Sequence, residues 1–259
     1  MTFSPRFREY FDPTALILSI FVIWELACLV FHVSPIVLPR PSQIITMLIV
    51  QMPALWPHIL QTLVTTMIGF TAGIALGVLL GVIVGVSRKA YNTAYPLLVG
   101  FSSIPKVAVV PILVLWFGSG AIPAILTAMV TCVFPIVVNV ATGLATTEPE
   151  MEDVLKALGA SRRQVLWNVG LPRAMPYFFA SLKIAVTLAF VGTVLSETVA
   201  SNRGIGTVMM MASASFDITL AFAGLFALAI LGVLLYGAFA VLEQRVCGWA
   251  SRKNDMATV

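Results

Sequence analysis

The sequence has little charge and few residues of the kinds that bind metals or form disulfides. Only 10% of its 259 residues are charged, and it contains three scattered cysteines, Cys28, Cys132 and Cys247, and two histidines, His32 and His58. No CxxC, HxxxH or HExxH spacing occurs, which argues against a zinc site, a redox pair or a disulfide framework. A P-loop of the form GxxxxGK[ST] is also missing, so the sequence gives no sign that this chain hydrolyses ATP.

Hydrophobic residues dominate instead. They make up 59% of the chain, and the mean hydropathy is +1.01, which excludes an ordinary soluble domain and indicates an integral membrane protein. The net charge of +4 does not indicate nucleic-acid binding, because the basic residues form short clusters between apolar runs rather than one stripe.

The hydrophobic runs predict an all-α, polytopic membrane protein with a single domain over residues 1–259. About six spans are expected, at residues 14–33, 59–86, 94–117, 122–144, 177–198 and 219–242. The first run follows Arg6 and Arg8 and resembles a signal peptide, but it is long, contains Trp24 and Glu25, and has no cleavage site, so we expect a retained helix. The proline-containing stretch 33–53 predicts a loop with a short interfacial helix.

Basic residues predict the orientation of these spans. With the N-terminus inside, the cytoplasmic side receives eleven of them: Arg6, Arg8, Arg88, Lys89, Lys156, Arg162, Arg163, Arg173, Arg245, Arg252 and Lys253. Only Arg40 and Arg203 fall clearly outside. This positive-inside bias places both termini in the cytoplasm.

Two spans carry local signals. Gly69, Gly73, Gly77, Gly81 and Gly85 recur every fourth residue and predict a smooth face for close helix packing, within one subunit or across a dimer. Pro105 and Pro111 interrupt the third span, and such backbone is tolerated at membrane depth only where protein or a wet cavity covers it.

One long polar stretch, "EDVLKALGASRRQVLWNVGLPRAMP", lies between the fourth and fifth spans. Met151, Val154, Leu155 and Leu158 share one face of a short helix. Thr147 with Glu150, and Ser161 with Gln164, have capping-box spacing, and Gly159 lies where a left-handed residue would end the first helix. Pro172 and Pro176 are expected to end the second helix. The stretch is either an amphipathic connector lying on the membrane or a docking element for a soluble partner.

The spacing Asp153-x5-Gly159-Ala160, followed by Val169-Gly170-Leu171-Pro172, resembles the EAA loop of membrane permeases in bacterial ATP-binding-cassette importers. Asp153 stands where that family usually has Glu, and Val154 and Leu155 replace two alanines. The nitrate, sulfonate and taurine permeases are the most similar branch, since "SSIPKVAVVPILVLWFGSG" resembles their middle region.

This resemblance implies a type I importer permease of the bacterial inner membrane, with a cytoplasmic coupling helix and no enzymatic activity of its own. It would work with a second permease copy, two ATPase subunits that bind ATP and Mg²⁺, and a periplasmic or extracellular solute-binding protein. The chain itself would need no cofactor or metal. The ATPase-docking residues it implies are Glu150, Met151, Glu152, Asp153, Val154, Leu155, Leu158, Gly159 and Ala160, and the loop would stop at Leu171 and Pro172.

Polar groups inside the spans are the candidates for the solute pathway. They are Lys106, Asn139, Lys183, Ser196 and Glu197. Lys106 could attract an anion such as a sulfonate, taurine or nitrate, or could instead snorkel or satisfy carbonyl groups. Arg203, Gly204 and Gly206 are expected to form an external turn, and the resemblance to the importer permeases implies a re-entrant or gating segment after it.

Two other classes of protein are alternatives. A secondary carrier or channel would explain the spans equally well, although no inverted repeat or intramembrane charge relay is evident. A membrane-embedded hydrolase would need a nucleophile–base pair or metal ligands at one depth in the membrane. The sequence does not place such residues beside either of the two histidines.

Overall fold

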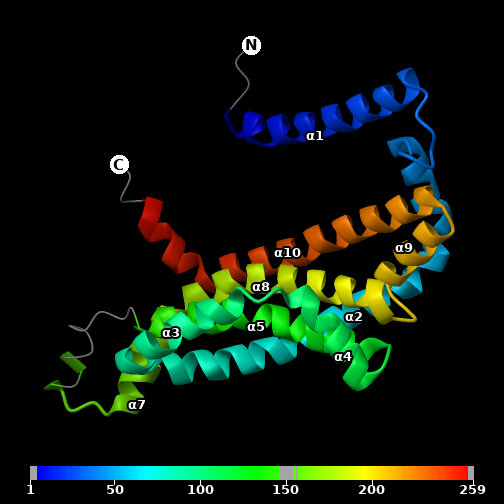
Figure 1. Ribbon diagram of the computed structural model, residues 1–259. Coiled ribbons are helices and arrows are strands. Elements are labelled where there is room, and N and C mark those ends of the chain that lie inside the picture. Colours follow the sequence, from blue (N-terminus) through cyan, green and yellow to red (C-terminus); the bar gives the residue numbers. More distant parts are fainter. Residues whose placement is uncertain (1–4, 146–153, 156, 256–259) are drawn as a thin grey trace.

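A computed structural model describes residues 5–145, 154–155 and 157–255. Every regular element in these ranges is helical (Figure 1), which confirms the all-α fold class. The elements are α1 (Pro5–Val30), α2 (Pro41–Gly85), α3 (Arg88–Ser102), η1 (Lys106–Ala108), α4 (Val109–Phe117), α5 (Ala121–Ala145), α7 (Arg162–Val165), the π-helix η2 (Leu166–Gly170), α8 (Leu171–Ala200), α9 (Ile205–Ala214) and α10 (Ile218–Asp255).

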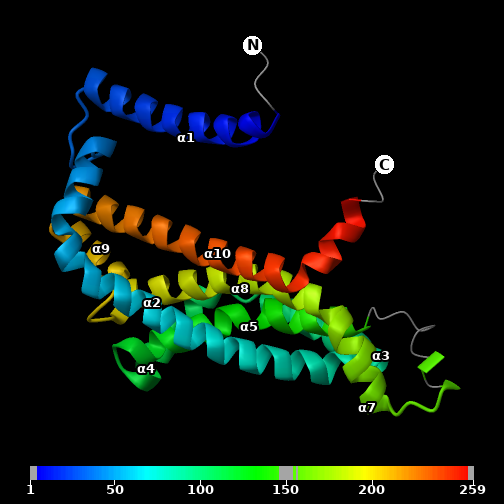
Figure 2. The same ribbon diagram turned by 180° about the vertical axis from the view of Figure 1, so that it is seen from behind.

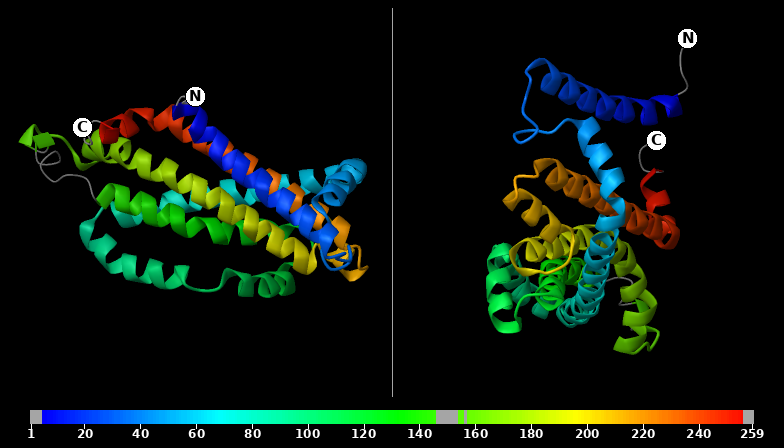
Figure 3. Two further views of the ribbon diagram at one scale, coloured as in Figure 1. Left: turned by 90° about the horizontal axis from the view of Figure 1, so that it is seen from above. Right: turned by 90° about the vertical axis from the view of Figure 1, so that its right-hand side faces the viewer.

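Long helices lie side by side in one bundle, with α5 packed between α2 and α8 (Figures 1 and 2). A buried cluster fills this contact and includes Phe70 of α2, Ile136 of α5 and Ala185 of α8. The helix α10 covers the other side of α8. The first helix, α1, lies apart from the bundle (Figure 3), and it reaches α10 through aromatic contacts such as Trp24 with Phe222.

Four helical segments are long and apolar enough to cross a membrane: Pro41–Gly85, Ala121–Ala145, Arg163–Ala200 and Ile218–Gly248. A fifth crossing is possible if α3 and Lys106–Phe117, which are bent by 69° relative to each other, count as one span. The part of α1 whose side chains are described, Thr14–Val30, is apolar but shorter than the roughly 20 residues that a crossing needs. The described residues therefore give four or five spans where six were expected.

The glycine face of α2 packs against α5 within the same chain. All five glycines are buried, and a Cβ added at Gly69 would lie 2.5 Å from the Ile125 carbonyl oxygen, while one at Gly77 would lie 2.8 Å from Ile136 Cβ. Because only hydrogen occupies these positions, the two backbones approach closely along the whole contact. The sequence left open whether this face packs within one subunit or across a dimer. The structure shows that it packs within the subunit.

Two expectations about proline need correction. The loop expected over 33–53 is shorter, since α2 begins at Pro41 and continues through Pro53 and Pro57. Both of these prolines are exposed, and membrane helices tolerate proline where the surroundings satisfy the freed carbonyl groups. In the third span, the break lies at Pro105, which has extended backbone, whereas Pro111 lies in the first turn of α4, where its missing N–H costs little.

Candidate functional site

The predicted docking loop lies at the end of the bundle where α5 ends and α8 begins (Figure 1). Glu150, Met151, Glu152, Asp153 and the expected Thr147 cap fall outside the described residues, as does Lys156. The Leu158 N–H donates to the Val154 carbonyl at 3.1 Å, and the Ala160 N–H donates to the Leu155 carbonyl at 2.9 Å. Gly159 then adopts φ +83°. The predicted left-handed break at Gly159 is confirmed.

The second half of the loop begins with the predicted capping box. The Ser161 N–H donates to Gln164 Oε1 at 2.8 Å, and the Gln164 N–H donates to Ser161 Oγ at 3.4 Å. Two orphan donors at the start of α7 are thereby satisfied, as the sequence predicted.

The expectation that Pro172 and Pro176 end this helix is wrong. The chain passes from α7 through the π-helix η2 into α8, and Arg163–Ala200 forms one helical segment of 38 residues. Pro172 is the second residue of α8 and directly follows the π turn. This turn replaces the i→i−4 hydrogen bonding that a proline would otherwise interrupt, so the helix continues through Pro172.

The two halves of the loop differ in how they contact the bundle. Leu166 and Leu171 pack on the buried cluster between α5 and α8, and Gly170 lies close to Leu144 of α5. In the first half, Val154 is 60% exposed and Leu158 is 79% exposed. These apolar side chains are four residues apart and share a helix face. The loop is thus anchored at its second half and leaves an apolar face uncovered at its first.

The structure does not bring the pathway candidates into one site. Lys106 Nζ donates to the Ser102 carbonyl and lies 5.8 Å from the centre of the Phe134 ring. Asn139 Nδ2 donates to the Pro135 carbonyl of its own helix at 2.8 Å. Lys183 forms an ion pair with Glu243 of α10.

Ser196 and Glu197 are buried at the opposite end of the bundle from the loop. Glu197 is only 2% exposed, and its Oε2 accepts hydrogen bonds from Thr62 Oγ1 at 2.9 Å and from the Gly206 N–H at 3.1 Å. His58 and Thr62 also join this cluster, and the sequence does not indicate either of them. The sequence signal near Glu197 is limited to Gly204 and Gly206, which follow the acid closely and allow a backbone N–H to return to it.

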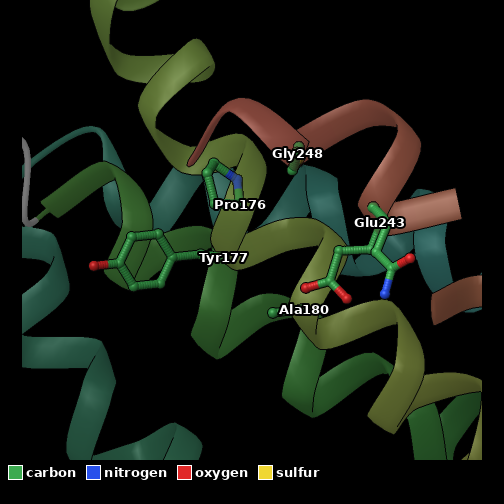
Figure 4. Close-up of a pocket in the computed structure, with 7 residues that line it drawn as sticks. Pro176, Tyr177, Ala180, Glu243 and Gly248 are labelled. Carbon is green, nitrogen blue, oxygen red and sulfur yellow. The ribbon is translucent and has the colours of Figure 1, made fainter. Parts of the chain in front are cut away.

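A groove of about 480 Å³ lies between α8 and α10, near the docking loop (Figure 4). Its lining residues are Pro176, Tyr177, Ala180, Glu243, Gln244, Cys247 and Gly248. Glu243 already pairs with Lys183, so the groove offers no unpaired carboxylate. Within the described ranges, no three His, Cys, Asp or Glu residues cluster as a metal site would require.

Comparisons with known proteins give a consistent result. A family model described as "Binding-protein-dependent transport system inner membrane component" matches residues 73–247. The chain is 32% identical to the formylaminopyrimidine transport permease protein ThiX of Halalkalibacterium halodurans, over 96% of this chain and 99% of that protein. It is 32% identical to the riboflavin transport system permease protein RibX of Chloroflexus aurantiacus, over 95% of both chains.

Two further matches are more distant. The taurine transport system permease protein TauC of Escherichia coli is 28% identical, over 88% of this chain and 85% of that protein. Among solved structures, a chain of the MetNI methionine ABC transporter, in a study titled for its inward-facing conformations, aligns with a TM-score of 0.66 at 23% identity. That alignment covers 76% of this chain and 97% of the other, and it shows a similar fold.

Proposed function

The chain belongs to the family of binding-protein-dependent transport system inner membrane components, and from this premise we propose that it pairs with a second copy to form the solute pathway of an importer. The ATPase resides on two separate cytoplasmic subunits, which bind ATP and Mg²⁺. A solute-binding protein delivers the solute to the outer side. This chain carries out no chemistry and changes shape in response to its partners.

The observation that carries this proposal is the uncovered apolar face of the docking loop. Val154 and Leu158 are exposed on a segment outside the bundle, and large apolar side chains in water favour burial against a partner. An amphipathic helix that inserts into a groove is a recurrent way to achieve this burial. The ATPase would supply the groove.

Anchoring of the second half of the loop supports a role in transmitting motion. Leu166 and Leu171 pack into the cluster that joins α5 to α8, and tightly packed interfaces move as units rather than deform continuously. An ATPase that binds the loop differently when closed and when open would therefore bias the bundle between two arrangements.

The distribution of basic residues supports an orientation with both termini in the cytoplasm. The start of α1, the α2–α3 junction, the α7 region and the end of α10 gather toward one end of the molecule (Figures 1 and 2). Ten of the eleven basic residues assigned to the cytoplasm lie on described helices in these regions, while Arg40 and Arg203 lie near the other end. This end would face the ATPase.

For the solute, we propose an organic molecule of the formylaminopyrimidine or riboflavin kind rather than a sulfonate such as taurine or an inorganic anion such as nitrate. The two relatives that are 32% identical are named for formylaminopyrimidine and riboflavin, whereas the taurine permease is 28% identical. The anion hypothesis depended on Lys106, which lies beside the Ser102 carbonyl and the Phe134 ring and not together with the other pathway candidates. Uptake of labelled formylaminopyrimidine, riboflavin, taurine and nitrate by cells with and without the gene would distinguish these classes.

Co-purification with a candidate ATPase subunit tests the docking role. We expect Gly159→Pro, Asp153→Lys and Leu158→Asp to insert normally and to lose the ATPase. Met211→Asp is the matched control, because Met211 is 68% exposed at the opposite end, and it should retain the ATPase. Retention by all variants would make the loop a surface connector and favour a carrier or channel that works without an ATPase.

A further inference from the structure

The polar cluster around Glu197 joins three helices at the end of the bundle opposite the docking loop. Glu197 lies near the end of α8, His58 and Thr62 lie on α2, and Gly204 begins α9. The side chains of Thr62 and Glu197 are almost completely buried. In a mostly apolar chain, buried polar groups at a three-helix junction need a physical explanation.

The cluster satisfies the start of α9 from outside that helix. The first amides of a helix have no partner within it. Here the Gly204 N–H donates to His58 Nδ1 at 3.1 Å, the Ile205 N–H to Thr62 Oγ1 at 3.0 Å, and the Gly206 N–H to Glu197 Oε2 at 3.1 Å. Three successive N–H groups are thus held by side chains of α2 and α8.

Thr62 is the central member of the cluster. Its hydroxyl donates to Glu197 Oε2 at 2.9 Å and accepts from the Ile205 N–H, so it links all three helices through one oxygen atom. A carboxylate at the positive end of a helix is also favoured electrostatically. No described cation pairs with Glu197, so α9 and Thr62 supply its stabilisation.

Gly204 makes this arrangement sterically possible. It has φ +128°, and a Cβ at this position would overlap the Glu197 carboxylate. Its backbone therefore lies directly against the acid. The other Glu197 oxygen, Oε1, is buried without a hydrogen-bond partner. One turn further along α2 and α8, the hydroxyls of Thr66 and Thr193 are also buried and unpartnered, so two further polar groups below the cluster are shielded from solvent.

We propose that Glu197, Thr62 and His58 form a latch that holds the start of α9 against α2 and α8 and thereby seals the outer end of the subunit. The role of this seal in transport rests on the proposed function, in which two subunits form the pathway and the outer end of each would have to open for solute arriving from outside. A latch of a few neutral hydrogen bonds and one carboxylate suits this task, because it is specific in geometry and can be released by a modest displacement.

Accessibility of a cysteine below the latch tests the proposal. Thr66→Cys is introduced after Cys28, Cys132 and Cys247 have been replaced by alanine, and right-side-out vesicles are treated with a positively charged, membrane-impermeant methanethiosulfonate. We expect Thr62→Val or Glu197→Ala to increase the modification rate about tenfold or more, since leaving one buried partner unsatisfied shifts an opening equilibrium by that order. Thr62→Ser keeps the hydroxyl and should react at the parent rate.

Two controls make the result decisive. A cysteine at the exposed position Met211 should react quickly in every background. Glu243→Gln removes the ion pair with Lys183 far from the latch and should leave the Thr66→Cys rate unchanged. Equal rates in Thr62→Val and Thr62→Ser, or an equal increase in Glu243→Gln, would overturn the latch. Cysteine labelling requires neither the ATPase nor the solute. The latch can therefore be refuted while ATPase docking is confirmed, and docking can be refuted while the latch is confirmed.

Discussion

The contact between the glycine face of α2 and α5 allows a prediction in which two neighbouring glycines respond differently to the same substitution. At Gly73, an added Cβ would overlap only Cys132 Sγ, and the next atom, the Met129 carbonyl oxygen, lies at 3.4 Å. At Gly69, the added Cβ would lie 2.5 Å from the Ile125 carbonyl oxygen. One obstacle is a side chain and the other is backbone.

The expected free energies follow from this difference. Overpacking costs about 1–3 kcal/mol, while replacing glycine by alanine in a helix gains about 1 kcal/mol. Gly73→Ala alone should therefore be destabilising by about 0–2 kcal/mol, and Cys132→Ala should relieve it, with a coupling of about 1–2 kcal/mol. Gly69→Ala should be destabilising without relief, because no side-chain truncation moves a carbonyl group.

The assay is thermal unfolding of the purified protein in detergent, followed by the loss of helical circular dichroism. Gly237→Ala is the matched control, since a Cβ at this helical position on α10 meets nothing within 4 Å, and it should be neutral or stabilising. If Gly69→Ala unfolds at the same temperature as Gly237→Ala, or if Cys132→Ala fails to rescue Gly73→Ala, the close approach of α2 and α5 is not what requires glycine.

Three further predictions concern other contacts. Gly204→Ala should lower the unfolding temperature markedly, because it combines overlap with a buried carboxylate and an unfavourable φ of +128°, each costing about 1–3 kcal/mol. Lys183→Glu and Glu243→Lys should each lower the unfolding temperature. The variant that carries both substitutions should recover part of this decrease if the Lys183–Glu243 ion pair joins α8 to α10. Ser161→Ala should cost the start of α7 about 1 kcal/mol, visible as faster hydrogen exchange at the Gln164 amide; an unchanged rate would show that the cap does not hold this turn.

Much of this architecture could be predicted from local patterns. The hydrophobic runs predicted an all-α membrane protein, and the Asp153-x5-Gly159 spacing predicted the importer permease family; both are confirmed. The left-handed Gly159 and the Ser161–Gln164 capping box are confirmed as well. Each of these features depends on residues close together in the sequence, where a single local conformational preference determines the structure.

The other features of the fold and of the candidate site depend on contacts between distant parts of the chain, which sequence spacing cannot show. Pro172 was expected to end a helix, but the π turn before it keeps the helix continuous. Thr62 and Glu197 are separated by 135 residues and meet only because α2 and α8 pack together. Pathway candidates such as Lys183 stand out in the sequence by polarity alone, which does not show their partners on other helices.

The unbroken helical segment from Arg163 to Ala200 has a mechanical consequence. It begins in the docking loop and contains Glu197, so one continuous run of helix connects both candidate sites, with a bend between α7 and α8 (Figure 2). Beyond the bend, the 20 residue steps from Tyr177 to Glu197 correspond to about 30 Å at 1.5 Å per residue. A tilt of about 8° around the middle of this part displaces each end by about 2 Å, which is enough to lengthen a hydrogen bond beyond its working range. In the orientation proposed above, a small rotation imposed at the docking loop would therefore move the far end of α8, without any helix unwinding or sliding.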